Sequence, residues 1–155
     1  MTRSLPASIR LPEAVTVLEV DYGNLPALQH LLKGQDAVIS ALGDTADAVA
    51  AQEVLIHAAL AAGVKRFIPS EFGSDTMNKR VRSMPFFANK LKHRDMLEKA
   101  SANNPSFTYS ILITGPFLDW GLSVVPFIIN VGTRSAGGKL LTHPCCYTIM
   151  LNMSL

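Results

Sequence analysis

Cysteine is scarce in this sequence, and its placement argues against two kinds of site. The two cysteines are adjacent, Cys145 and Cys146, so they match neither the spacing of a zinc site nor a disulfide framework. The four histidines are dispersed and show no metal-ligand spacing either: His30, His57, His93 and His143. We therefore expect no metal site, and a reducing compartment.

Long hydrophobic runs are also lacking. The amino end has no apolar core of the kind found in signal peptides. The longest apolar stretch, Trp120 to Val131, is too short to span a bilayer and is interrupted by Pro126. These features predict a soluble, cytoplasmic protein without a membrane partner.

Charge is sparse and nearly balanced. Charged residues make up 17% of the 155 residues and the net charge is +2, whereas about a quarter charged is usual. The basic residues at 79–82 and 90–94 are too few for a nucleic-acid footprint but sufficient for one phosphate-bearing cofactor. The hydrophobic share of 48% favours a single, densely packed domain.

The chain does contain a regular alternation of strand and helix patterns. Strands are predicted at 15–21, 36–43, 66–70 and 107–112, and helices at 25–33, 46–62 and 86–100. Asn24 is the expected cap of the first helix, and Asp44 or Thr45 that of the second. This alternation predicts right-handed βαβ crossovers and a parallel sheet, in which the continuously apolar strand 36–43 is buried.

The stretch from Gly63 to Asp75 changes from packing residues to polar ones. Its short apolar strand runs into a polar loop that begins at Ser70. In an open α/β sheet, ligands bind beyond the carboxyl ends of the strands. We therefore expect this loop to lie at the ligand-binding edge.

The run at 62–73, Ala-Gly-Val-Lys-Arg-Phe-Ile-Pro-Ser-Glu-Phe-Gly, resembles the NmrA-like family, in particular its isoflavone reductase and phenylcoumaran benzylic ether reductase branch. The similarity extends from about residue 3 to about residue 131. It implies an atypical short-chain-dehydrogenase fold that uses NADPH. Residues 1–131 are thus expected to be a partial NAD(P)-binding domain, and residues 132–155 a tail that does not match the family.

The sequence has no counterpart of the glycine-rich phosphate-binding turn that is typical of this fold. Such folds open with a strand, a Gly-x-x-Gly-x-x-Gly-type turn and a helix, and no such glycine cluster precedes Val15. We expect a Rossmann-like doubly wound parallel sheet that lacks its first strand, glycine-rich turn and first helix. Arg3 then resembles the family's arginine for the NADPH 2′-phosphate, and the chain as given is expected to bind NADPH weakly or not at all.

Lys90 and Arg94 reproduce a pair that the family uses in catalysis. There, a lysine shortly after the Ser-Glu-Phe-Gly loop acts as general acid/base, and an arginine four residues later contacts NADP. Residues four apart share one face of a helix. On residue type alone, an exposed lysine is the more common situation, so the assignment of Lys90 as catalytic rests on the resemblance.

The remaining cofactor residues are predicted at two strand ends. Ser70 and Phe72 lie where the resemblance puts the nicotinamide, although Phe72 could equally fill core. Ala41, Leu42 and Gly43 end a strand at the same edge, where small residues admit ribose and diphosphate. Small residues also pack helices, so both interpretations stay open.

The resemblance implies an NADPH-dependent reductase that transfers hydride to a small aromatic or enone-like substrate. The alternatives are a non-catalytic NAD(P)-sensing regulator of the NmrA type and an inactive fragment. Lys90 favours the reductase. The identity of the substrate and the oligomeric state stay open.

Overall fold

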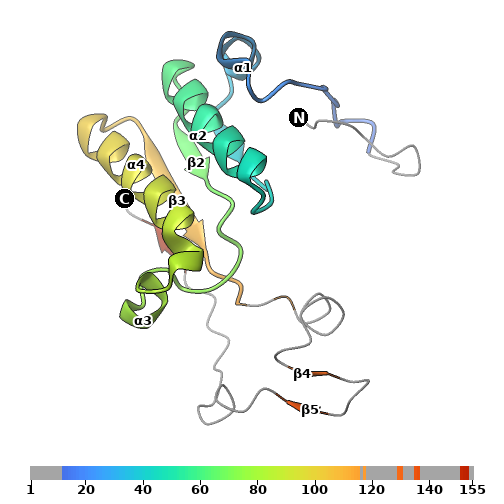
Figure 1. The fold of residues 1–155 in the computed structure, drawn as a ribbon. Helices are drawn as coiled ribbons and strands as arrows, with labels where there is room; N and C mark the ends of the chain where they lie inside the picture. Colours follow the sequence, from blue (N-terminus) through green and yellow to red (C-terminus); the bar gives the residue numbers. More distant parts are fainter. Residues whose placement is uncertain (1–11, 116, 118–128, 131–134, 137–150, 154–155) are drawn as a thin grey trace. The chain divides into compact units, whose positions relative to one another are not determined.

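The computed structural model describes residues 12–115, 117, 129–130, 135–136 and 151–153 (Figure 1). It divides into two compact units. The first contains residues 12–70 and 92–110, and the second contains residues 71–91 and the described residues from 111 onward. Each unit is described by itself.

Three neighbouring strands of the sheet are parallel. They are β1 (Ala37–Ile39), β2 (Arg66–Ile68) and β3 (Thr108–Leu112), in the order β1-β2-β3. Val38 is paired with Phe67 in register, and Phe67 in turn with Tyr109. Since each connection between neighbouring strands contains a helix, this is the α/β, Rossmann-like architecture that the sequence predicts.

The helices begin at the residues that their caps predict. Helix α1 (Leu25–Leu32) is capped by Asn24, whose side-chain oxygen accepts a hydrogen bond from the Ala27 N–H at 3.1 Å. Helix α2 (Ala46–Ala61) is capped by Thr45 in the same way through Ala48. After α1 the chain reverses at Gly34, whose φ of +81° favours glycine. A third long helix, α4 (Ala88–Asn103), precedes β3.

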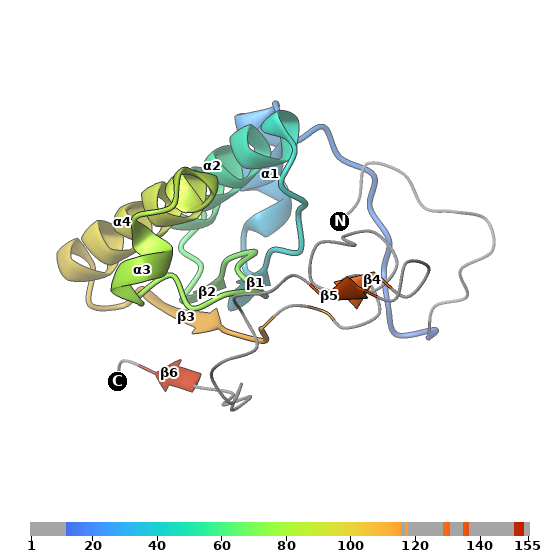
Figure 2. The same ribbon diagram turned by 60° about the horizontal axis from the view of Figure 1, so that its bottom comes forward.

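The core lies between these helices and one side of the strands. Figure 2 shows α1, α2 and α4 along one face of the sheet. Val38 and Phe67 are buried in the core, whereas Ala37 is exposed and Ile39 is 66% exposed. The prediction of a continuously buried strand at 36–43 is therefore wrong: the strand covers only Ala37–Ile39, where successive side chains point to opposite faces, and Asp36, Ala41 and Gly43 are exposed as well.

Residues 15–21 do not form the predicted strand. Glu19 makes an isolated bridge, and the rest of the segment has no strand hydrogen bonding. Val15 is 48% and Leu18 40% exposed. A β-branched run has strand propensity, but a strand also needs a neighbouring backbone to pair with along its length, and within the described residues this segment has none beyond that bridge.

The second unit contains shorter elements. Helix α3 (Lys79–Arg82) and the 3₁₀ helix η1 (Pro85–Phe87) precede α4, and α3 was not predicted. Strands β4 (Ile129–Asn130) and β5 (Ser135–Ala136) pair antiparallel, and β6 comprises Leu151–Met153. Across the described part of the chain, no helix combines the length and apolar character needed to cross a membrane.

Candidate functional site

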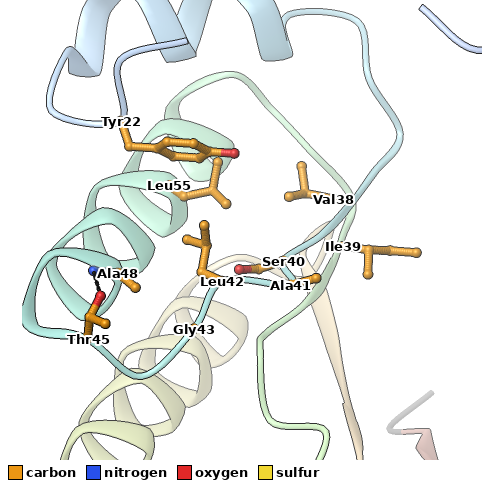
Figure 3. Close-up of a pocket in the computed structure, with 10 residues that line it drawn as sticks. All are labelled: Tyr22, Val38, Ile39, Ser40, Ala41, Leu42, Gly43, Thr45, Ala48 and Leu55. Carbon is orange, nitrogen blue, oxygen red and sulfur yellow. Dashed lines mark hydrogen bonds between the residues drawn. The ribbon is translucent and has the colours of Figure 1, made fainter. Parts of the chain in front are cut away.

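A pocket of about 450 Å³ opens at the carboxyl end of β1 (Figure 3). It is bounded by the residues that follow β1 and by the amino end of α2. Figure 3 shows Leu42 and Leu55 next to the ring of Tyr22, whereas Ile39 points away from them. The complete lining is Tyr22, Val38, Ile39, Ser40, Ala41, Leu42, Gly43, Thr45, Ala48 and Leu55. The predicted cofactor residues Ala41, Leu42 and Gly43 all belong to it.

The residues of this pocket fit part of a dinucleotide. Side chains are small at Ala41 and Ala48, and a Cβ atom added at Gly43 would meet nothing within 4 Å. The amino end of a sixteen-residue helix, α2, borders the pocket, and helix amino ends favour phosphate groups.

The ends of β1 and β2 are joined by hydrogen bonds. The Ser40 N–H donates to the Ile68 carbonyl at 2.8 Å, and the Ser70 hydroxyl donates to the Leu42 carbonyl. These bonds bring the predicted residues Ser70 and Leu42 together in the first unit. The carboxyl ends of β1 and β2 therefore lie at the same edge of the sheet, as expected.

A buried glutamine, which sequence reasoning missed, strengthens the same junction. The Gln52 side-chain oxygen accepts hydrogen bonds from the Ser40 hydroxyl at 2.6 Å and from the Ser70 N–H at 3.1 Å. Gln52 is 3% exposed. The sequence does contain one sign of this role: Gln52 lies on the same helix face as the apolar residues Ala48 and Leu55. A polar residue within an apolar stripe usually meets a polar partner.

His93 belongs to this hydrogen-bonded group as well. Its Nδ1 lies 3.2 Å from Gln52 Nε2. Burial lowers the pKa of His93, whereas the Glu53 carboxylate and, to a smaller degree, the Val49 carbonyl raise it. The balance favours the neutral imidazole. The sequence shows His93 only as one of four dispersed histidines and gives no sign of this contact.

In the second unit, the loop after β2 is held in a constrained conformation. Phe72 has a φ of +29°, which is unusual for a residue with a side chain. A Cβ atom added at Gly73 would approach the Glu71 carbonyl oxygen to 3.2 Å. The Thr76 hydroxyl donates to the buried Glu71 carboxylate at 3.4 Å. Glu71 thus anchors the loop, and Phe72 is half-buried within it.

Lys90 contacts this loop directly. Its Nζ donates to the Glu71 carbonyl at 2.8 Å, and the side chain is half-buried. The Gly73 carbonyl also accepts a bond from the Gly115 N–H at 3.0 Å. The predicted catalytic lysine is therefore fixed against the Ser-Glu-Phe-Gly loop rather than extended into solvent.

Two arginines, Arg94 and Arg3, were also predicted to contact the cofactor. Arg94 lies one turn after Lys90 in α4 and is 8% exposed. Arg3 lies outside the described residues. Within residues 12–115 and the short described segments that follow, no group of three or more His, Cys, Asp or Glu side chains could hold a metal ion.

The comparison with known families decides the assignment. The model of the NmrA-like family matches residues 7–145. The chain belongs to the NmrA-like family. The resemblance identified from residues 62–73 is thereby confirmed.

Curated relatives of this NmrA-like chain include enzymes from fungi and a plant. It is 42% identical over 113 residues to oxidoreductase aprR of Aspergillus flavus, covering 71% of this chain and 37% of the relative. It is 35% identical over 126 residues to oxidoreductase poxI of Penicillium oxalicum, covering 79% and 38%. It is 34% identical over 113 residues to isoeugenol synthase 1 of Clarkia breweri, covering 68% and 34%.

A solved structure also resembles this NmrA-like chain. The structure of AtPrR2 with NADP+ and (+)pinoresinol superposes with a TM-score of 0.55 at 27% identity, covering 66% of this chain and 34% of that one. The chain thus spans between 34% and 38% of the lengths of these proteins.

Proposed function

We propose that this chain is part of an NADPH-dependent reductase of the isoflavone reductase type, acting on a small aromatic or enone-like substrate. The observation that carries the proposal is the contact of the Lys90 amino group with the Glu71 carbonyl at 2.8 Å. It holds an ionisable group on the Ser-Glu-Phe-Gly loop, where the family resemblance calls for a general acid/base. The NADP+ and (+)pinoresinol in the structure of AtPrR2 support the choice of cofactor and substrate class.

The proposed cofactor-holding residues form two sets. Ala41, Leu42 and Gly43 line the pocket at the end of β1, and Ser70 is bonded to Leu42. Phe72, Arg94 and Arg3 complete the assignment on the strength of the family resemblance. When bound, NADPH supplies the hydride, and the residues of the protein supply binding and orientation.

In this proposal Lys90 handles the proton. Its amino group already donates one hydrogen bond, to the Glu71 carbonyl, and a lysine has three N–H donors. We assign to the ammonium group the transfer of a proton to a substrate oxygen, and to the neutral amine the uptake of a proton in the reverse direction. The constrained φ of Phe72 and the anchoring of Glu71 by Thr76 keep that carbonyl, and with it the amino group, in place.

The test separates catalysis from cofactor binding. Because the chain spans about a third of its relatives, NADPH oxidation is measured on the chain as given and on a version preceded by a βα unit with the glycine-rich turn of a relative. Lys90→Ala should lower turnover by about 10²–10⁴-fold and leave the NADPH dissociation constant within about twofold.

The matched control is Lys99→Ala, on the same helix, where the side chain is exposed. It should retain turnover. Equal turnover by Lys90→Ala and the unmodified protein would refute the role of Lys90. Cofactor binding without NADPH oxidation across a panel of enones and aromatic ethers would favour the sensing regulator instead.

A further inference from the structure

One buried amide connects the ends of β1 and β2 to α4. Gln52, from α2, accepts bonds from the Ser40 hydroxyl and the Ser70 N–H, and its Nε2 meets His93 Nδ1. All four residues belong to the first unit. Gln52, Ser40 and His93 are each at most 3% exposed, so water cannot readily replace a bond that breaks.

The orientation of the amide follows from its partners. A backbone N–H can only donate, so the Gln52 atom that faces the Ser70 N–H must be the oxygen. The other end is then the NH₂ group, which can only donate. His93 Nδ1, 3.2 Å away, must therefore be the acceptor. This requires a neutral imidazole with its proton on Nε2.

The surroundings of the ring favour the same state. His93 Nε2 is buried and makes no hydrogen bond among the described residues. The nearest carboxylate oxygen, Glu53 Oε1 from α2, is 3.8 Å away and is held at 2.6 Å by Lys92 of α4. Burial lowers the pKa of His93. Glu53 and the Val49 carbonyl oppose this effect, and Lys92 adds to it.

We propose that Gln52 and neutral His93 are positioning residues that hold the ends of β1 and β2 in the geometry needed for the dinucleotide, and that a proton on His93 releases them. The inference rests on the proposed function, because the two strand ends matter for catalysis only if the cofactor binds there. Ser40 and Leu42 line the pocket at that edge. The Ser70 hydroxyl bonds to the Leu42 carbonyl and so links the end of β2 to the pocket.

The release follows from the count of donors and acceptors. A proton on Nδ1 makes His93 a donor that faces the donor NH₂ of Gln52. Rotating the amide by 180° restores that contact, but it then turns the NH₂ group towards the Ser70 N–H, which is also a donor. In either orientation one buried bond is lost. In the rotated one the Ser70 N–H loses its acceptor, and the ends of the two strands are then no longer held by the same oxygen.

NMR on the ¹⁵N-labelled chain tests the coupling without any cofactor. We expect the Ser70 amide and the Gln52 side-chain amide to titrate with the same midpoint as the His93 ring. In His93→Asn, which keeps an acceptor close to the Nδ1 position but cannot titrate, both changes should vanish. His57→Asn is the control, since His57 is an exposed residue of α2, and it should leave them intact. A Ser70 amide that ignores the His93 titration would overturn the proposal.

A second variant acts from the other side of the contact. Gln52→Glu keeps oxygen acceptors for Ser40 and Ser70 and places a carboxylate beside the His93 ring. The midpoint of the His93 titration should then rise by at least about one pH unit. A midpoint within about 0.2 units of the unmodified chain would show that residue 52 does not govern the protonation of His93, contrary to the proposal.

A second experiment titrates NADP+ into the protein and monitors NMR chemical-shift changes, which detect weak binding. The 2′-phosphate of NADP+ gains a proton near pH 6, so the unmodified chain and His93→Asn are compared at pH 7.5 and 5.5. We expect the loss of affinity on acidification to be about tenfold larger in the unmodified chain, the effect of one hydrogen bond. Equal losses in the two proteins would overturn the role in cofactor binding.

The outcomes also separate this inference from the proposed function. No NADP+-induced shift at either pH, in the chain as given or in the version preceded by the βα unit, would refute cofactor binding and with it the proposed function. A shared titration of Ser70 and His93 in that same experiment would still establish that the pair positions the two strand ends.

Discussion

The two faces of the small sheet in the first unit differ sharply in what they bury. On the side covered by α1, α2 and α4, Val38 and Phe67 are enclosed, and the buried Gln52 side chain bonds to Ser40 and meets His93 Nδ1. On the opposite side, Ile39 is 66% exposed, and Arg66 bonds to Ser110 at 3.1 Å. The first face therefore determines the stability of the unit and the placement of its strand ends, while substitutions on the second should be tolerated.

The largest expected effect is at Phe67, the fully buried aromatic residue of the central strand. Phe67→Ala should lower the free energy of unfolding by about 3–5 kcal/mol, because it removes buried apolar surface and leaves a cavity. Ile39→Ala on the opposite face is the matched control and should cost less than about 1 kcal/mol. Urea denaturation of both variants measures the difference, and similar losses would remove the contrast between the faces.

A smaller effect depends on pH and involves the polar part of the buried face. Burial lowers the pKa of His93 below its ordinary 6.5, so as the pH falls the unfolded state takes up the proton first. The free energy of unfolding should be constant above about pH 6.5, decline below it, and level off once His93 is protonated in the folded state.

Thermal midpoints measured between pH 7.5 and 4.5 check this dependence. The comparison is with His93→Asn, in which this component should be absent, and with His57→Asn, in which it should persist. Identical pH profiles for the unmodified chain and His93→Asn would contradict it.

The smallest effect is expected at Lys65 and Asp36, an ion pair at 2.7 Å whose side chains are 71% and 81% exposed. The Lys65 hydrogen bond and charge lower the pKa of Asp36. Lys65→Met should therefore raise the pKa of Asp36, as followed by NMR of its carboxyl group. The thermal midpoint should stay within about 1 °C, because water screens exposed pairs. A clear fall in the thermal midpoint would show that exposed ion pairs contribute more to stability than the comparison of the two sheet faces implies.

The sequence predicts the elements that depend on local signals. The caps at Asn24 and Thr45 agree with the structure, because each is decided within a few residues. The strand predicted at 15–21 fails, since pairing depends on a neighbour that local sequence does not reveal. Helix α3 is too short to leave a periodic pattern.

The site was predictable only where a family motif marked it. Ala41, Leu42, Gly43 and Ser70 were expected at one edge, and Lys90 was expected near the loop that it contacts. The roles of these residues remain predictions. Gln52 was missed, because its partners Ser40, Ser70 and His93 are 12, 18 and 41 residues away in the chain, and no spacing rule connects them.

The shared oxygen of Gln52 has a consequence for how such a chain can diverge. An apolar substitution at position 52 alone leaves several buried groups without partners at once, so a single apolar change at this position should not persist among relatives. Positions 40, 52 and 93 should instead change together, as a correlated set among relatives that retain the fold. A relative with an apolar residue at position 52 should also have lost the hydroxyl at position 40 and the imidazole at position 93, and its cofactor edge should be insensitive to acid.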